Sequence, residues 1–496
     1  MKFKHISLVI ALLAITYSSY AQYSQDALRF SRFGPGSTSR IKAIGNASTA
    51  VGGDMSSIGG NPAGLGFFNK SEFSFTPEYN GSEITSTYFG QTDLETRDQF
   101  NLNNASIVFH SPQVRGRGTD PTTGLLSVNF GVGYNRTNNF YDKTFYGEIN
   151  PNSSIADFYA DIANTQGFVN LGQSGGNVLA GWAADQGLID SVTSDAIGTL
   201  YGATTSLNNR QNFTQVTSGG QNEFNLALGA NYSNKLYLGF SLGLTSLRYE
   251  SSSTFQETDG SDNDYRTFYD MDQTTTGSGF NFKLGMIYKP VEAVRLGASF
   301  TSPTWYTIED NTSLNMETFY TQGNSPAANY DNFPTNYNLR TPLKVSGGIA
   351  VFMNQFGFIS ADVEYVDYST INVSGYDNDS GDNENIDNQY QAAVNARVGA
   401  EAKLDKIYLR GGFNYQGNPE KNIGGATNTV SGGIGYRINN VYIDATYAHV
   451  SSKQTVFGYE FDPGSTTNIY GDEIYSPEAN QKRIYNNAYL TVGFRF

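Results

Sequence analysis

One run of this sequence, Gly172-Gln173-Ser174-Gly175-Gly176, has the spacing of a nucleophilic serine elbow. Such an elbow needs a strand, a sharp turn, a helix and a histidine partner. The run lies in a polar stretch, and only His110 and His449 follow the amino-terminal segment. Neither histidine has an acidic ligand at a spacing usual for zinc, and Cys is absent, which excludes thiolate chemistry. We therefore expect no enzyme, no metal centre and no cofactor.

Basic side chains form a second candidate group, for binding a carboxylate ligand. Each lies in a segment where apolar and polar residues alternate, which places the polar set on one face of a β-strand. In a closed barrel that face is the lumen. The candidate cations are Lys283, Arg397, Lys403 and Arg410. Acidic residues alternate onto the same face, namely Asp362, Glu364, Glu401 and Asp444. For any single cation we favour the alternative that it belongs to a neutralising ion pair.

Aromatic side chains in residues 153–205 form a third group. Their helical spacing predicts short helices there. The residues that carry the pattern are Ile155, Phe158, Tyr159, Ile162, Val178, Leu179, Trp182, Ala183 and Leu188. Phe158, Tyr159 and Trp182 are candidates for an apolar platform that receives a ligand. The alternative is that these helices pack only on their own loop, and the sequence leaves both open.

The amino terminus has the pattern of an export signal. Lys2 and Lys4 precede an apolar run from Ile6 to Tyr17 that is too short to span a bilayer. Ser19 and Ala21 are small, so we predict a signal peptide over residues 1–21, removed before Gln22. The net charge of −15 disfavours a nucleic-acid partner. The acidic run from Asp377 to Gly381 lacks the spacing of a calcium loop.

Strict alternation recurs from about residue 71 to the end of the chain. At the carboxyl terminus Leu490, Val492, Phe494 and Phe496 share one face. Similar sets begin near Phe73, Ile107, Leu126, Phe224, Leu236, Phe280, Val294, Val345, Ile359, Val394, Leu409, Val430 and Val441. This makes about 14 strands, each near the 9–11 residues that a tilted membrane-spanning strand needs.

The connections between these strands alternate in length. Short turns such as Ser233–Lys235 and Asn439–Asn440 alternate with long polar segments, interpreted as external loops over residues 138–221, 250–277, 303–341, 369–389 and 451–486. Outer-membrane barrels have short periplasmic turns and long external loops. With 34 Tyr, 33 Phe and 54 Gly, the composition suits aromatic girdles and tight turns. The sequence predicts an all-β protein, an antiparallel transmembrane barrel of about 14 strands in the bacterial outer membrane.

A glycine-rich segment between the signal and the first strand does not alternate. It contains Ala50-Val51-Gly52-Gly53-Asp54 and then Asn61-Pro62-Ala63-Gly64-Leu65, in which Asn-Pro favours a turn. Such a chain could pack inside a narrow lumen. The second run resembles the hatch signature of the FadL/TodX family of outer-membrane transporters, and the first resembles its divergent form in Bacteroidetes-type members. The loops and the amino-terminal arm, Gln22 to Lys42, depart from that family pattern.

The resemblance implies three parts: a signal peptide over 1–21, a plug or hatch over 22–70 and a barrel over 71–496. It implies passive transport of hydrophobic compounds such as long-chain fatty acids. Ligands would be captured at the external loops and would leave sideways, past the plug, through the barrel wall near a kink in an early strand. The expected partners are outer-membrane lipid and a hydrophobic ligand, and a monomer is expected although the sequence leaves the oligomeric state open. The alternatives are a secretion shuttle like PorV, which binds exported cargo, and a non-specific porin.

Overall fold

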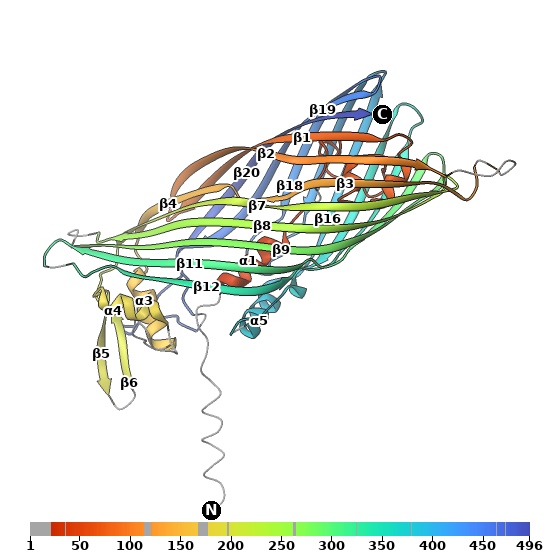
Figure 1. Cartoon of the computed structure of the whole chain (residues 1–496). Helices are drawn as coiled ribbons and strands as arrows, with labels where there is room; N and C mark the ends of the chain where they lie inside the picture. Colours follow the sequence, from red (N-terminus) through yellow and green to blue (C-terminus); the bar gives the residue numbers. More distant parts are fainter. Residues whose placement is uncertain are drawn as a thin grey trace, which may run out of the picture.

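The chain forms one closed antiparallel barrel of 14 membrane-crossing strands, which confirms the predicted fold class. The computed structural model describes residues 21–34, 36–113, 120, 122–166, 177–195, 198–260, 264–323, 325–377, 379–462, 464–471 and 473–496. Most of the signal segment and the run 172–176 lie outside the described residues. The barrel closes where β1 (Glu72–Tyr88) pairs with β20 (Glu478–Arg495), so the first and last strands are neighbours (Figure 1).

Four of the crossings consist of two strands separated by a short interruption. They are β3 (Leu125–Asn139) with β4 (Asp142–Asn150), β10 (Val294–Thr301) with β11 (Trp305–Tyr320), β12 (Asn329–Arg340) with β13 (Lys344–Phe352), and β14 (Gly357–Asp367) with β15 (Asn372–Ser374). The other strands are β2 (Gln91–Pro112), β7 (Asn209–Tyr232), β8 (Leu236–Thr258), β9 (Tyr265–Val291), β16 (Ala392–Leu404), β17 (Ile407–Gln416), β18 (Thr427–Ile438) and β19 (Val441–Phe457).

The alternation of side chains separates a lipid-facing surface from the lumen. On β8, Leu238 and Phe240 are 48% and 44% exposed, whereas Ser241, the residue after Phe240, is fully buried. On β20 the predicted apolar face, including Leu490 and Phe494, is likewise outward, and Thr491 is buried. An outward apolar band with polar residues behind it is the pattern of a membrane-spanning barrel. The short turns need positive φ angles, for example 57° at Ser233 and 50° at Asn439.

The prediction that the long polar segments are loops is wrong for most of their length. Strands β7, β8 and β9 contain 24, 23 and 27 residues, and β11, β12, β19 and β20 also run through segments interpreted as loops. Segment 369–389 contains β15 and the helix α5 (Asp379–Gln389). The physical reason is that the ladder continues above the bilayer, where outward residues face water and are polar. Only the lipid-facing part of each strand shows apolar alternation.

A small external subdomain follows β4. It consists of α3 (Ile155–Gln166), α4 (Val178–Asp185) and the hairpin of β5 (Ile189–Asp195) and β6 (Gly198–Ala203), and it projects from one end of the barrel (Figure 1). Glu257 at the end of β8 holds it by accepting hydrogen bonds from the Ser154 hydroxyl, at 2.5 Å, and from the Ile155 backbone, at 3.0 Å. Short helices in an external loop were predicted, and they are present.

The described residues before β1, from Ala21 on, lie inside the barrel (Figure 1). They form α1 (Ala21–Ser31), α2 (Ser39–Ala43) and the short 3₁₀ helices η2 (Met55–Ser57) and η3 (Pro62–Phe67). Among the described residues, no helix is both long and apolar enough to cross a bilayer. The domain boundaries at residues 21 and 70 stay predictions.

Candidate functional site

The Asn61–Leu65 motif is the turn that fastens the plug to the wall. The Asn61 side chain caps η3 by accepting a hydrogen bond from the Ala63 backbone at 3.1 Å. Its amide group donates to the Thr49 carbonyl at 2.7 Å, within the plug, and to the Met286 and Ala298 carbonyls on the wall at 3.3 and 3.2 Å. One asparagine therefore shapes the turn and joins it to two barrel strands.

Glycines on the inner wall let the plug backbone approach closely. A Cβ atom added to Gly239 would overlap the backbone of Pro62, and one on Gly285 would overlap the Asn61 side chain. Four more wall glycines have the same role. Gly229 lies against Leu65, Gly297 against Thr49, Gly399 against Ile44, and Gly412 against both Ile44 and Gly45. Gly229 and Gly239 flank the turn at Ser233–Lys235, so the plug closes the end of the barrel that carries the short turns. Glycine in a strand interior marks such an approach of backbones.

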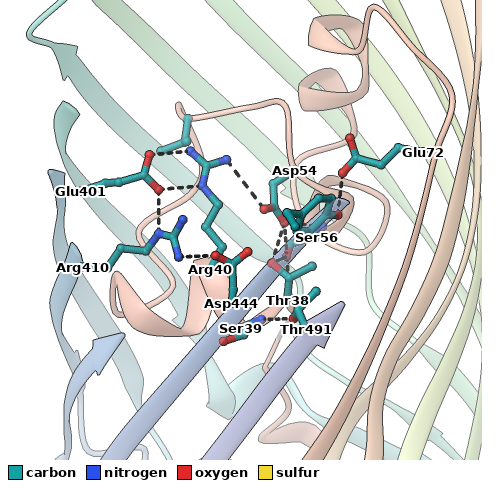
Figure 2. Close-up of polar contacts among 12 residues, drawn as sticks. Thr38, Ser39, Arg40, Asp54, Ser56, Glu72, Glu401, Arg410, Asp444 and Thr491 are labelled. Atoms are coloured by element: carbon teal, nitrogen blue, oxygen red, sulfur yellow. Dashed lines mark hydrogen bonds and ion pairs between the residues drawn. The ribbon is translucent and has the colours of Figure 1, made fainter. Parts of the chain in front are cut away.

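A buried chain of charges links the plug to the wall (Figure 2). Arg40 of α2 donates to Glu401 through Nε at 2.8 Å and through Nη2 at 3.2 Å. Arg410 also donates to Glu401, at 2.7 Å, and to Asp444, at 2.6 Å. Arg437 completes the chain at Asp444, at 2.9 Å. Buried charges are tolerated because each has a hydrogen-bonded counterion.

Hydroxyl groups extend this contact beside the charges (Figure 2). Thr38 donates from its hydroxyl to Asp54 at 2.8 Å, and its backbone donates to Ser56 Oγ at 2.8 Å. The Ser39 backbone donates to Thr491 Oγ1 on β20 at 2.8 Å. The plug is thus attached to the last strands as well as to β16 and β17.

The predicted cations lie in different surroundings. Lys283 is buried in an ion pair with Glu223, and Arg397 pairs with Glu364 at 2.7 Å. Arg410 belongs to the charge chain described above. Lys403 lies apart from it, exposed near the turn at Asp405 with its ammonium 5.8 Å from the Tyr408 ring. The three buried cations therefore already have carboxylate partners in the protein.

The upper lumen is filled by a buried apolar cluster, in which α1 packs against the wall, and the sequence did not reveal it. The wall residues of this cluster are called the chamber below. Helix α1 buries Ala27, Leu28 and Phe30 there. The Phe30 ring lies 5.9 Å from the Phe140 ring and 5.9 Å from the Tyr249 ring. The other buried members of this cluster are Leu247, Tyr306, Ile308, Tyr337, Leu339, Val366, Tyr368, Ile371, Val373, Ile386, Tyr390 and Ala393. Tyrosines beside aliphatic groups make a lining suited to an apolar or aromatic molecule.

Phe140 marks a break in the wall of this chamber. Strand β2 pairs with β3 only as far as Asn104 and Asn135, and β4 pairs with β7 but not with β2. The end of β3 bonds instead to the arm after α1, since the Gly34 backbone donates to the Thr137 carbonyl at 3.1 Å. In the described part of the chain no ladder joins β2 to β4; side chains bridge the break instead, such as the Lys143–Glu95 ion pair at 2.8 Å and the Arg97 guanidinium, which donates to the Asp142 carbonyl at 3.2 Å. The lateral opening expected beside a kink in an early strand stays a prediction.

The aromatic platform residues lie in the external subdomain. Tyr159 and Trp182 are each 1% exposed, and they belong to a buried cluster that also contains Phe255, Tyr265 and Met316 of the barrel strands. Phe158 is partly buried, 5.6 Å from the Tyr459 ring and 6.4 Å from the Phe461 ring. Two of the three residues are therefore buried between the subdomain and the barrel, and the role of a platform stays a prediction.

Comparison with solved structures shows the same fold in outer-membrane channels. The chain aligns over 93% of its length with 99% of the toluene transporter TodX of Pseudomonas putida, at 13% identity and a TM-score of 0.54. A Pseudomonas aeruginosa FadL homologue aligns over 93% of this chain and 98% of its own, at 13% identity and a TM-score of 0.51. A deltaS2 mutant of the TodX monoaromatic hydrocarbon channel gives a TM-score of 0.56 at 12% identity, over 93% and 99% of the two chains.

No family model and no curated protein matches the sequence. The class that the fold defines is the plugged 14-strand outer-membrane barrel, which confirms the predicted resemblance and location at the level of the fold. Assignment to the Bacteroidetes-type form stays a prediction.

Proposed function

We propose that this protein carries hydrophobic small molecules passively across the outer membrane. A ligand enters from the external side, replaces apolar contacts of α1 in the chamber around Phe30 and leaves sideways at the β3/β4 break beside Phe140. The observation that carries this proposal is the contact of the apolar chamber with that break, above a plug that closes the other end. Neighbours with the same fold are named as transporters or channels for toluene and monoaromatic hydrocarbons.

The lumenal charges bear on the ligand class. Long-chain fatty acids and small aromatic hydrocarbons both fit an apolar chamber. However, Lys283 and Arg397, two of the buried cations that were predicted to bind a carboxylate ligand, are each neutralised by a glutamate. Recruiting either cation for a fatty acid would leave a buried carboxylate unpaired, which is costly. This favours ligands recognised by apolar contact, with toluene as the first probe and oleate as the second.

Crosslinking across the wall break tests the exit route. The chain lacks Cys, so Glu95→Cys with Lys143→Cys gives one defined thiol pair between β2 and β4. Joining it with a short cleavable dithiol-specific linker should lower uptake of labelled toluene by cells, and cleavage should restore it. The control pair, Asn428→Cys with Ser451→Cys, spans the continuous β18/β19 ladder and should not alter uptake. Unchanged uptake in the linked β2/β4 variant would refute lateral exit there.

A deletion strain tests the transport function itself. Loss of the protein should reduce toluene uptake, and the intact gene should restore it. Unchanged uptake together with loss of protein secretion would instead support the cargo-binding shuttle.

A further inference from the structure

A groove lies on the outer wall of the barrel, at a place to which the proposed transport route assigns no role. It occurs where three neighbouring crossings are interrupted at the same level, namely β10/β11, β12/β13 and β14/β15. In the third crossing the interruption contains the 3₁₀ helix η4 (Tyr368–Thr370). The cavity has a volume of about 660 Å³ and is lined by residues of β8, β9, β11, β12 and β15. Pro303 and Pro342 stand in two of the interruptions, where a missing N–H ends the ladder.

The interruption is satisfied internally and is therefore a built feature of the wall. The Thr304 backbone donates to Thr341 Oγ1 at 2.9 Å, and the Thr341 backbone donates back to the Thr304 carbonyl at 3.1 Å. On the next strand, the Phe282 backbone donates to Ser302 Oγ at 3.0 Å. These bonds hold the strand ends apart without leaving their polar groups unpaired.

The groove has an apolar half and a polar half. The apolar half consists of Leu244, Phe280 and Trp305, which are 49%, 50% and 38% exposed, with the two aromatic rings 5.2 Å apart. The polar half consists of Thr307, Asn338, Arg340, Asn372 and Ser374. Along β8 the outward residues are Leu238, Phe240 and Leu244 on one side of this level and Arg248 and Glu250 on the other. The groove thus straddles the external edge of the lipid-facing band, where tryptophan is favoured.

Arg340 is the charged group of the groove. It is exposed on β12, directly opposite Trp305 in the ladder. Among the described residues no carboxylate lies within ion-pair distance of it, and the outward acid further along β11, Glu309, is opposite Asn336. By contrast Arg248 on the same outer surface is paired with Glu250. On a chain with a net charge of −15, an unpaired arginine beside an apolar slot at the bilayer edge is complementary to an anionic amphiphile.

We propose that this groove binds a lipid of the outer leaflet whose phosphate group gives it a net negative charge, with its headgroup at Arg340 and an acyl chain against Leu244, Phe280 and Trp305. The guanidinium supplies the charge-assisted hydrogen bonds, and the amide and hydroxyl groups around it complete the headgroup contacts. This site opens on the outer wall and the chamber lies in the lumen, although Tyr306 and Leu339 line both. The proposal does not depend on the transport function.

Fluorescence quenching tests the proposal, because the chain has only 2 Trp. In the Trp182→Phe variant the emission comes from Trp305 alone. The purified protein is reconstituted in phosphatidylcholine vesicles with increasing fractions of phosphatidylglycerol brominated on its acyl chains. Brominated phosphatidylcholine serves as the comparison. We expect a roughly fivefold preference of the Trp305 site for the anionic lipid, the size of one interfacial arginine interaction.

Arg340→Gln should reduce that preference to about one, whereas Arg248→Gln, with the same change in net charge, should retain it. Inorganic phosphate at millimolar concentration should compete only weakly, because it lacks the acyl contacts. Equal quenching by both lipids, retention of the preference in Arg340→Gln, or full competition by inorganic phosphate would each overturn the proposal. Heat modifiability on gels checks that each variant is folded.

Discussion

The attachment of the plug through Arg40 can be tested quantitatively. Arg40 makes two hydrogen bonds to Glu401 and lies 3.8 Å from Asp54, and its side chain is 18% exposed. A hydrogen bond to a charged group contributes about 1.5–3 kcal/mol. Two such bonds together would contribute about 3–6 kcal/mol. In Arg40→Gln the Glu401 carboxylate keeps Arg410 as a partner, so we expect a smaller loss, about 2–3 kcal/mol. The population with a released plug should therefore rise roughly 30- to 140-fold.

Thiol labelling measures this population. Ser360 is 1% exposed on β14, and its hydroxyl donates to the Ala47 carbonyl of the plug at 2.8 Å, so Ser360→Cys places a thiol beneath the plug. When plug opening is faster than labelling, the rate of modification by a maleimide follows the released population. We expect the rate in Arg40→Gln to exceed that in the parent by the factor above.

The matched control is Arg437→Gln. Arg437 is 20% exposed and binds Asp444 in the same chain of charges, but that pair lies within the wall. Its removal should leave the labelling rate of Ser360→Cys unchanged within about threefold. Equal rates in the parent and Arg40→Gln would refute the view that this ion pair holds the plug in place.

Three further predictions follow from the geometry. Gly239→Leu should prevent the plug from seating against Pro62 and produce a steady conductance in planar bilayers, whereas Gly347→Leu, at a position with free space, should not. Glu257→Ala should destabilise the docking of the external subdomain by about 3 kcal/mol, seen as faster limited proteolysis with the barrel still heat-modifiable. Burial raises the pKa of Asp382 from 3.8 to about 6. The fold favours its protonated form, so docking of α5 is strongest below the unfolded pKa and weakens as pH rises through 6. After division by the intrinsic, base-catalysed exchange rate at each pH, hydrogen exchange of α5 should report more frequent opening as pH rises from 4 to 8, and this residual dependence should be lost in Asp382→Asn.

The lipid-facing parts of the strands could be predicted because a bilayer imposes a strong period of two on the outer surface. The polar extensions above it could not. On β8, Arg248 and Glu250 are outward and Tyr249 is inward, so the alternation persists with polar residues outside and no longer matches the membrane pattern. A search for inward apolar residues flanked by outward polar ones would have found these extensions.

The position of the plug left a signal in the sequence that the strand assignments did not use. Gly239, Gly285 and Gly297 interrupt otherwise apolar or bulky strands, and each is where plug backbone touches the wall. Helix α1 left a weaker signal. Its buried residue Asp26 pairs with Arg29 within the helix, but it also accepts a hydrogen bond at 2.7 Å from Gln273, which is far away in the sequence. Local propensity carries no information about such a contact.

The plug and helix α1, the two parts of the chain in the lumen, are held by different kinds of contact. This difference supports the proposed route of a ligand past α1. Releasing the plug breaks the Arg40–Glu401 pair and separates backbones that fit against wall glycines, so it exposes charges that need their counterions. Displacing α1 breaks mainly apolar contacts and a few hydrogen bonds, such as that from Gln221 to the Phe30 carbonyl at 2.8 Å. A hydrophobic ligand can replace those apolar contacts with its own, but it cannot replace the ion pairs. Binding energy from such a ligand therefore acts on α1 and the chamber beside Phe140, while the plug remains the seal of the barrel.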